Sequence, residues 1–207
     1  MSTGLFIVFE GGDGVGKSTQ AEMLAAWLRS EDVGEKSVLE TREPGGTALG
    51  REVRQAVMHG DHVAPRAEAL LYAADRAHHI ATKVRPALDR GEIVVQDRYV
   101  DSSVVYQGGA RGLGDEVERI SRWATENLLP DLIVVLDAAV APDRLARELD
   151  RVERETVEHA EAIRTAFLDR AALDPQRYVI IDGHGTVDEV HARVRAAVEP
   201  LLKAKRP

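Results

Sequence analysis

The sequence Gly11-Gly12-Asp13-Gly14-Val15-Gly16-Lys17-Ser18 follows an apolar run at residues 5–9 and precedes a stretch with helical spacing at residues 18–29. This is the pattern G-x-x-x-x-G-K-S/T between a strand and a helix, the setting in which it forms a phosphate-binding loop. Glycines let the backbone bend until successive N–H groups point inward, and the following helix adds the positive end of its dipole. The stretch therefore predicts an α/β fold that binds a nucleoside triphosphate.

Two side chains of the loop have distinct expected roles. Lys17 is expected to reach the β- and γ-phosphate oxygens, and Ser18 to offer a hydroxyl ligand to Mg²⁺, a hard cation that prefers oxygen. A glycine-rich turn without a ligand would also match the pattern, but the spacing, the Lys-Ser pair and both flanking elements favour the functional interpretation. The residues expected to bind the triphosphate are Gly11, Gly12, Asp13, Gly14, Val15, Gly16, Lys17, Ser18 and Thr19.

Length and composition set the outer limits. A chain of 207 residues suits one α/β domain with a sizeable core, so residues 1–207 are expected to form a single domain. No stretch approaches the roughly 18 consecutive apolar residues that a membrane span needs. Because the chain lacks cysteine and its N-terminus lacks the pattern of a secretory signal, we expect a cytoplasmic protein without disulfides. The formal net charge of −8 argues against extensive binding to nucleic acid.

Strands and helices alternate along the chain, without an internal repeat. The apolar run at residues 5–9 is typical of a central parallel strand that is covered on both faces. Further strands are expected at residues 37–41, 92–97, 131–137 and 178–182. Helices are expected at residues 18–29, 65–90, 115–129 and 186–202, with a bend or restart at Pro86. Asp115 with Glu118, and Thr186 with Glu189, predict capping boxes for the last two helices.

Apolar residues at helical spacing predict which helix faces are buried. The expected core positions are Met23, Leu24, Trp27 and Leu28, then Leu70, Leu71, Ala74, Ile80, Val84 and Leu88, and finally Ala160, Ile163, Phe167 and Ala171. His78 and His79 are interpreted as solvated or core-edge residues, because no matching array of metal-binding side chains accompanies them. Residues 203–207 are expected to form a frayed basic tail.

Arg42 and Glu43 mark a candidate anion site after the second strand. Pro44 and the glycines that follow it suit a turn, and Thr47 suits a helix cap, but neither role requires Arg42. Ligands of open α/β sheets lie beyond the carboxyl ends of the strands, where an arginine is well placed to bind an anionic group. A surface ion pair beside a turn is the alternative. At least one of Arg51 and Arg54 on the next helix is expected to face the same crevice.

A second cluster follows the strand at residues 92–97. Asp97 is placed to hold magnesium or its waters, and Arg98 to hold a phosphate oxygen. Tyr72 and Arg76 lie four residues apart on one helix face, which suits a base-binding pair, although a tyrosine half-buried against the sheet is the commoner arrangement. Hydrogen-bonding residues before a glycine pair suggest a pocket wall, namely Ser102, Ser103, Tyr106 and Gln107.

The densely charged segment after residue 142 has two interpretations. Arg144, Arg147, Arg151 and Arg154 are spaced three, four and three residues apart, which places them along one helix face. They form either a solvated helix with paired charges or a short helical lid, at about residues 142–156, whose arginines fold over the triphosphate.

Three blocks of sequence together resemble the thymidylate kinase family. They are residues 9–19 around the phosphate loop, Thr41-Arg42-Glu43-Pro44-Gly45-Gly46-Thr47, and Asp97-Arg98-Tyr99 followed by Ser102-Ser103 and Tyr106-Gln107-Gly108. The resemblance runs from Leu5 to the last helix. It implies a three-layer α/β/α sandwich with five parallel strands, and transfer of the γ-phosphoryl group of ATP to dTMP with Mg²⁺. It also implies a homodimer.

The resemblance further assigns roles to matching positions. Asp13 would contact the sugar near its 3′-hydroxyl, Arg42 and Arg98 would hold the acceptor phosphate, and Tyr106 would favour a deoxyribose. Tyr72, at a position usually occupied by phenylalanine, would lie against thymine, with Arg76, Ser103 and Gln107 completing the base pocket. Asp97 would serve the magnesium together with Ser18. The implied catalytic residues are Lys17, Arg98 and Arg151, although the segment before Arg151 is several residues shorter than in the family.

Two other functions remain open on the sequence alone. One is a different nucleotide or deoxynucleoside kinase on the same scaffold, which a screen of nucleosides and monophosphates with ATP would identify. The other is a non-catalytic nucleotide switch, in which Arg42, Arg98 and Tyr72 need not converge on one pocket.

Overall fold

The computed structural model describes residues 4–30, 36–138 and 159–204. The predicted lid segment at residues 142–156, with Arg144, Arg147, Arg151 and Arg154, lies outside the described residues, as do the last three residues of the predicted basic tail.

Five parallel strands form one sheet, in the order β2-β3-β1-β4-β5. Their bounds are Leu5–Glu10 (β1), Val38–Arg42 (β2), Ile93–Asp97 (β3), Leu132–Asp137 (β4) and Tyr178–Asp182 (β5). Each lies within one residue of its predicted position. β1 is central and completely buried, as its unbroken apolar run predicts for a strand covered on both faces. The prediction of a five-stranded parallel sheet is therefore confirmed.

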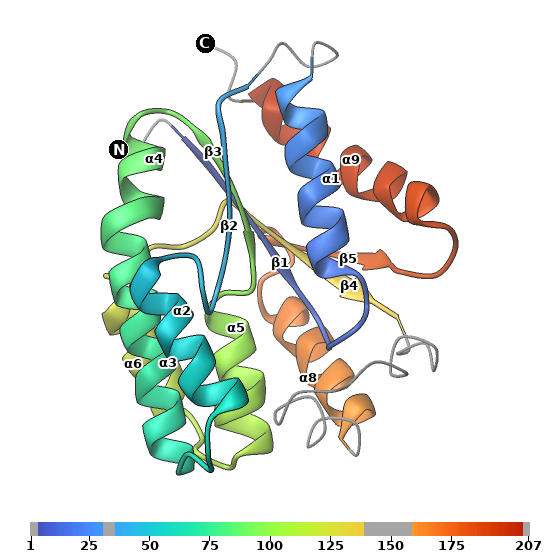
Figure 1. Cartoon of the computed structure of the whole chain (residues 1–207). Helices are drawn as coiled ribbons and strands as arrows, with labels where there is room; N and C mark the ends of the chain where they lie inside the picture. Colours follow the sequence, from blue (N-terminus) through green and yellow to red (C-terminus); the bar gives the residue numbers. More distant parts are fainter. Residues whose placement is uncertain (1–3, 31–35, 139–158, 205–207) are drawn as a thin grey trace.

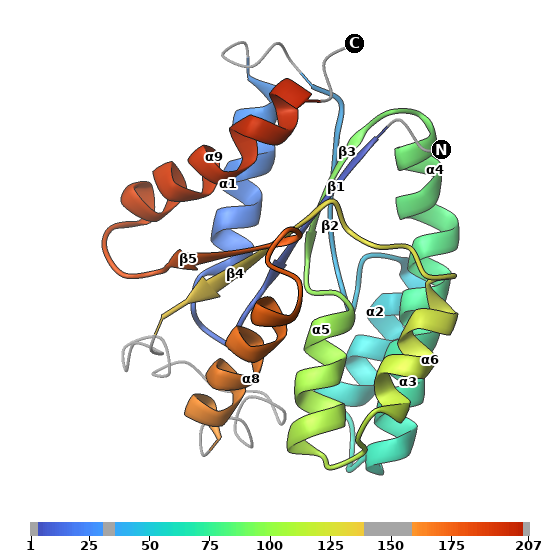
Figure 2. The ribbon, with the colours of Figure 1, turned by 180° about the vertical axis from the view of Figure 1, so that it is seen from behind.

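Helices cover both faces of this sheet. α1 (Lys17–Arg29) and α9 (Val187–Ala204) lie side by side on one face, as Figures 1 and 2 show from opposite sides. The other face packs against α4 (Arg85–Asp89), α8 (Ala160–Leu173) and the π-helical segments η3 (Ile80–Val84) and η4 (Val104–Ala110). Two hydrophobic cores fill the spaces between the layers, one on each face. The predicted three-layer sandwich is therefore present.

The remaining helices pack against one another and against the π-helical segments. They are α2 (Ala48–Arg54), the π-helical segment η2 (Gln55–His59), α3 (Pro65–His79), α5 (Val100–Ser103) and α6 (Glu116–Ala124). In the described part of the chain, each helix is either too short or too polar to cross a lipid bilayer.

The buried face of α3 is shifted by about one residue from the predicted one. Leu70 and Ala74, predicted to be buried, are exposed, whereas Ala69 and Ala73 are buried. The buried face also carries Glu68, Tyr72, Asp75, Arg76 and His79. Because polar side chains such as Glu68, Arg76 and His79 have partners in the interior, the apolar periodicity of this helix did not identify its buried face. On α8, Ile163, Phe167 and Ala171 are buried as predicted.

The predicted breaks and caps have mixed outcomes. α4 restarts around Pro86, and Thr186 and Glu189 form the predicted capping box through bonds of 2.7 and 3.3 Å. The predicted box at Asp115 is wrong, since Asp115 makes no side-chain cap and Glu118 binds Arg122 and Arg170 instead. The helix beginning there also ends earlier than predicted, because Glu126 and Asn127 adopt positive φ angles that a helix cannot continue through.

Candidate active site

The phosphate loop and the two arginine-bearing segments leave the sheet at the same edge. Arg42 is in register with Asp97, and Phe9 is in register with Asp97 from the other side. These residues end neighbouring parallel strands, so the segments that follow β1, β2 and β3 converge. This is the edge where ligands of open α/β sheets bind.

A cavity of about 570 Å³ opens between these segments. All eight substrate-binding residues predicted from the sequence line it: Asp13, Arg42, Tyr72, Arg76, Arg98, Ser103, Tyr106 and Gln107. Of the other predicted residues, Gly14, Gly16, Lys17, Ser18, Thr19 and Asp97 also line it. Gly11, Gly12 and Val15 do not line the cavity, and the Val15 side chain packs in the core beside α1.

The phosphate loop is held by its own backbone and by Lys17. Gly16 caps α1 with a φ of 100°, which a residue with a side chain rarely adopts. Lys17 is buried, and its Nζ donates to the carbonyl oxygen of Gly12. Burial, and secondarily the charge of Arg98, lowers the pKa of Lys17 to about 8, while Asp13 and Asp97 oppose this shift. A bound polyphosphate would favour the charged form of this lysine.

Ser18 and Asp97 contact each other beside the loop. The Ser18 hydroxyl donates to one carboxylate oxygen of Asp97 at 2.5 Å. The other oxygen of Asp97 is buried and has no hydrogen-bond partner among the described residues. A buried carboxylate oxygen normally has a partner, and a hard divalent cation with its waters would supply one.

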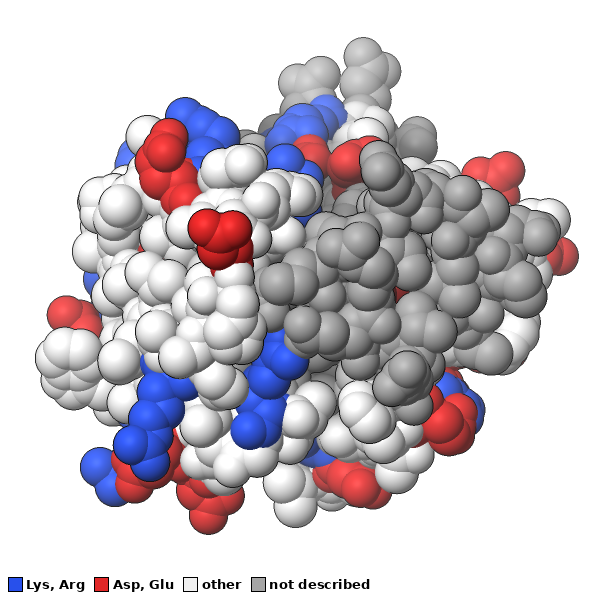
Figure 3. Space-filling model, turned by 60° about the horizontal axis from the view of Figure 1, so that its bottom comes forward, with Lys and Arg blue, Asp and Glu red and all other residues white. Residues whose placement is uncertain are grey.

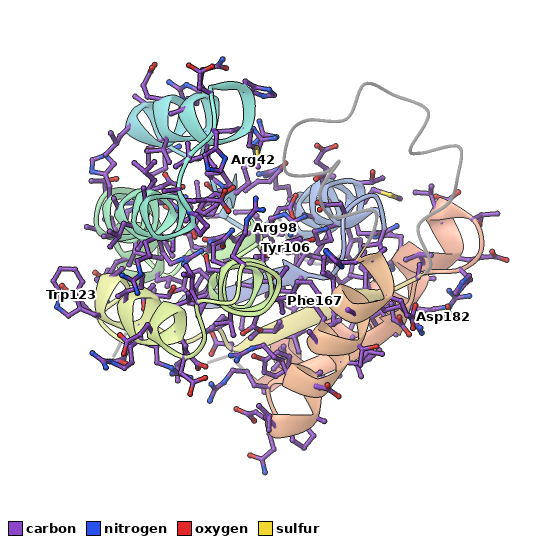
Figure 4. The ribbon with its side chains drawn as sticks, turned by 90° about the horizontal axis from the view of Figure 1, so that it is seen from below. Arg42, Arg98, Tyr106, Trp123, Phe167 and Asp182 are labelled. Carbon is purple, nitrogen blue, oxygen red and sulfur yellow. The ribbon has the colours of Figure 1, made fainter. Side chains whose placement is uncertain are left out.

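Arg98 lies between the loop and η4. Its guanidinium group donates to the carboxylate of Asp13 and, at 3.0 Å, to the hydroxyl oxygen of Ser102. The Tyr106 hydroxyl donates to the same aspartate at 3.0 Å, and the Arg98 guanidinium carbon lies 5.3 Å from the centre of the Tyr106 ring. Figure 4 shows Arg98 and Tyr106 together at the centre of this end of the molecule. Although burial works against its charge, Asp13 and other neighbours raise the pKa of Arg98, which therefore stays protonated.

Arg42 lines the cavity from the end of β2, whereas Glu43 beside it points into the interior. Glu43 accepts from Arg76 Nε at 2.7 Å and contacts His79 Nδ1 at 2.9 Å. The alternative of a local ion pair between Arg42 and Glu43 is therefore wrong. The interpretation of His79 as a solvated or core-edge residue is also wrong, because it is fully buried and joins Glu43 to Thr41. A side chain at Gly46 would collide with this histidine.

Arg76 is fixed by several buried partners. Besides Glu43, its guanidinium donates to the Ser121 hydroxyl and the Tyr99 carbonyl, both at 3.0 Å, and to the Ser103 hydroxyl at 3.1 Å. Gln107 is held similarly, since its amide donates to Glu68 at 3.0 Å. Arg76 and Gln107, which line the cavity, are therefore oriented by a further set of buried polar groups.

The sequence patterns did not reveal most of this further set. Ser121 and Glu68 were not singled out, because each occupies a position that an ordinary helix residue could fill. The buried Asp75, which lines the cavity itself, and Glu10 were not singled out either. Arg54, one of the two arginines expected to face the crevice, lines the cavity. Tyr72 packs against Val53 and Val57 of α2 and η2, so the alternative of a tyrosine against the sheet is wrong.

Comparisons with known proteins agree with this geometry. A sequence model of the thymidylate kinase family matches residues 9–194. The chain is 51% identical over 209 residues to a thymidylate kinase of Clavibacter michiganensis subsp. michiganensis, and the alignment covers 98% of both chains. It is 54% identical over 204 residues to a thymidylate kinase of Leifsonia xyli subsp. xyli, and that alignment covers 95% of both chains. The crystal structure of thymidylate kinase from Ehrlichia chaffeensis superposes with a TM-score of 0.78 at 28% identity, covering 94% of this chain and 98% of that one. The chain therefore belongs to the thymidylate kinase family, the phosphotransferases that use ATP to phosphorylate dTMP.

Proposed function

We propose that the cavity binds ATP and dTMP head to tail, with the transferred phosphoryl group between Lys17 and Arg98. The observation that carries this proposal is that Lys17, Arg42 and Arg98 line one cavity although they lie at or after the ends of three different strands. The backbone of the phosphate loop and Lys17 hold the triphosphate, and the two arginines hold the acceptor phosphate.

The other end of the cavity suits a thymine deoxynucleoside. Tyr72 offers a ring face to the base, while Arg76, Ser103 and Gln107 offer fixed polar groups to its edge. Asp13 and Tyr106, which bind each other, lie beside Arg98 and suit contacts with the sugar. A non-catalytic switch has no use for this second set of ligands. A kinase for another monophosphate or for a nucleoside is disfavoured by the family relationship.

We further propose that Ser18 and Asp97 hold Mg²⁺, directly or through water. The buried, unpartnered oxygen of Asp97 supports this role. When bound, the cation neutralises charge on the phosphate oxygens.

The residues of the chain contribute alignment and charge rather than a nucleophile. A phosphate monoester is already a competent nucleophile, so no activating base is required. Arg98 orients the acceptor oxygen and neutralises its charge, and Arg151 is proposed to add charge from the opposite side. The role of Arg151 rests on the resemblance of its sequence segment alone.

Steady-state kinetics of Arg98→Ala test the proposal. The variant is expected to raise the KM for dTMP at least about tenfold, because one charge-assisted contact with the acceptor is lost, while the KM for ATP changes little. Lys17→Ala provides the contrast, since it should chiefly lower turnover. An equal rise of both KM values in Arg98→Ala would contradict the assignment of Arg98 to the acceptor phosphate.

Three further expectations belong to the same proposal. A homodimer is supported by large exposed apolar side chains on α3 and α6. A role without nucleic acid is supported by the net charge of −8. On the face that Figure 3 shows, the described Lys and Arg residues form no continuous field. A cytoplasmic location fits an enzyme that uses ATP and a deoxynucleotide.

A further inference from the structure

Glu10 is a buried acid that lies outside the substrate cavity. It ends β1, directly before the phosphate loop, and its exposed fraction is 0%. It is absent from the residues that line the cavity. Its carboxylate instead accepts three hydrogen bonds from the segment after β3: from the backbone N–H groups of Tyr99 at 2.8 Å and Ser102 at 3.2 Å, and from the Ser102 hydroxyl at 2.6 Å.

These bonds fix the start of the helix that carries the acceptor residues. The first N–H groups of any helix have no partner within it, and α5 begins immediately after Tyr99. Glu10 supplies the missing acceptor from a different strand. α5 continues without a break into η4, so the same contact holds Ser103, Tyr106 and Gln107 in register with the phosphate loop.

The backbone of Arg98 is held on both sides, and on one of them by Glu10. Arg98 has a φ of 67°, a conformation that is uncommon for a residue with a side chain and must be imposed by its surroundings. On one side its N–H donates to the carbonyl of Phe9, the neighbour of Glu10. On the other side Tyr99 is held by Glu10 itself.

The side chain of Arg98 is linked to Glu10 through a single hydroxyl. Ser102 donates to Glu10 and accepts from Arg98 at 3.0 Å, so its oxygen has a defined direction. Burial, followed by the charge of Asp101, raises the pKa of Glu10 to about 7, whereas its hydrogen bonds and the charge of Arg98 act in the opposite direction. An apolar residue would avoid this cost of burial but would leave two N–H groups and the hydroxyl unpaired.

We propose that Glu10 is a positioning residue for the phosphoryl acceptor, acting through Ser102 and the start of α5 to aim Arg98 at the acceptor phosphate. The inference rests on the proposed function of Arg98. It extends the site to a residue that touches neither substrate, and it explains why a carboxylate stands where the end of a central strand would otherwise favour an apolar side chain.

Glu10→Gln tests the inference with little change of shape. We expect the KM for dTMP to rise about tenfold and the KM for ATP to stay within about twofold, because the loss is transmitted to Arg98 and to the helix that carries the other acceptor residues. A residue with a merely structural role would lower the free energy of unfolding without this split between the two substrates. Equal effects on both KM values, or none on either, would overturn the inference.

Ser102 supplies a second test that does not depend on the folding of a Glu10 variant. Ser102→Ala is expected to raise the KM for dTMP similarly, and Ser102→Thr, which keeps the hydroxyl, to restore it to within about threefold of the wild type. If Glu10 acts through Ser102, the double variant Glu10→Gln with Ser102→Ala should be no worse than the more affected single variant. If the KM increases of the two single variants multiplied in the double variant, Glu10 would not act through Ser102.

Ser30→Ala is the matched control. It removes a serine hydroxyl that bonds to the Trp27 carbonyl at 2.7 Å, at the end of α1 away from the cavity, and should leave both KM values unchanged. The two proposals fail separately. If Arg98→Ala spares the KM for dTMP, the proposed function of Arg98 is wrong, whereas an effect in Arg98→Ala without one in Glu10→Gln removes only the role of Glu10.

Discussion

Asp75 is a carboxylate that the fold buries at an energetic cost. It is 1% exposed on α3, near Glu43 and beside the substrate cavity. Burial, and then the charge of Glu43, raises its pKa from 3.8 to about 6, although His79 and Arg76 oppose the shift. The folded chain therefore binds a proton at this group between about pH 4 and 6, where the unfolded chain has released it.

This shift predicts a pH-dependent stability difference. Ionisation of buried Asp75 lowers the free energy of unfolding, so its destabilising effect is smallest below pH 4 and grows as the pH rises through 6. The total effect is about 1–3 kcal/mol. In Asp75→Asn, which cannot ionise, this loss is absent. Urea unfolding should therefore show that the variant gains stability relative to the wild type on going from about pH 4.5 to about pH 7.5. A stability difference that is the same at both pH values would contradict the shift.

Asp97 gives a prediction for the metal. Asp97→Asn keeps the shape of the side chain but removes its charge, so the Mg²⁺ concentration that gives half-maximal activity should rise at least about tenfold. The measurement is the initial rate against free Mg²⁺ at a fixed concentration of ATP. Asp131→Asn is the control, because Asp131 binds the Phe6 N–H before β4 and has no place in the cavity. An unchanged Mg²⁺ requirement in Asp97→Asn would show that another group holds the cation.

Among single residues, the sequence identified those that line the cavity better than those that hold the lining residues in place. Arg42 and Arg98 follow strands, and the position of a strand end is a local property that hydrophobic patterning reveals. The partners of Arg76 are different. Glu43 lies 33 residues from it in the chain, and Ser121 lies 45 residues away, so only the tertiary fold selects them.

Among the elements, α9 has the capping box that its sequence predicts. Thr186→Ala removes the side-chain acceptor for the N–H of Glu189 and should destabilise the folded chain by about 1 kcal/mol. Denaturant unfolding measures this difference. Thr82→Ala is the matched control, since its exposed hydroxyl only bonds back to the His78 carbonyl within a helical segment, and its loss should be close to neutral. Equal destabilisation by both substitutions would contradict a capping role.

The failure at Asp115 shows why only one of the two boxes was predicted correctly. Both pairs have the required spacing, but Glu118 has a stronger option in Arg170 of α8, at 3.1 Å, and in Arg122. Glu189 accepts from the Thr186 backbone and has no comparable arginine pair among the described residues. A local motif forms when no tertiary partner competes for its side chain. α3 follows the same logic, because its buried polar face is defined by partners on other elements.

For the molecule as a whole, the order of the strands could be anticipated only in part. The unbroken burial of β1 follows from its composition, and five alternating βα units predict a parallel sheet. The packing of α3 against α2 and α6 could not be predicted, since nothing local determines which helices pack together away from the sheet. Of this group, α2 and α3 nevertheless line the cavity, through Arg54, Tyr72, Asp75 and Arg76.

The same group of helices has an apolar surface that the described part of the chain does not cover. Leu70 on α3 is 58% exposed and Trp123 on α6 is 82% exposed, and the two helices pack against each other. Figure 4 shows Trp123 pointing away from the molecule. Large apolar side chains that gather on adjacent elements are typical of an interface, and in a twofold dimer such a surface would meet its own copy.

Sedimentation tests this homodimer. The wild type should sediment with about twice the 22.7 kDa mass of one chain. The double variant Leu70→Glu with Trp123→Glu should sediment as the monomer, because dimerisation would bury two carboxylates of each subunit at the interface, which is costly. Val187→Glu is the control, since Val187 is 43% exposed at the start of α9, on the opposite side of the sheet, and its substitution should leave the dimer intact. A wild-type chain that sediments as a monomer at every concentration, or dissociation by Val187→Glu as well, would contradict an interface on α3 and α6.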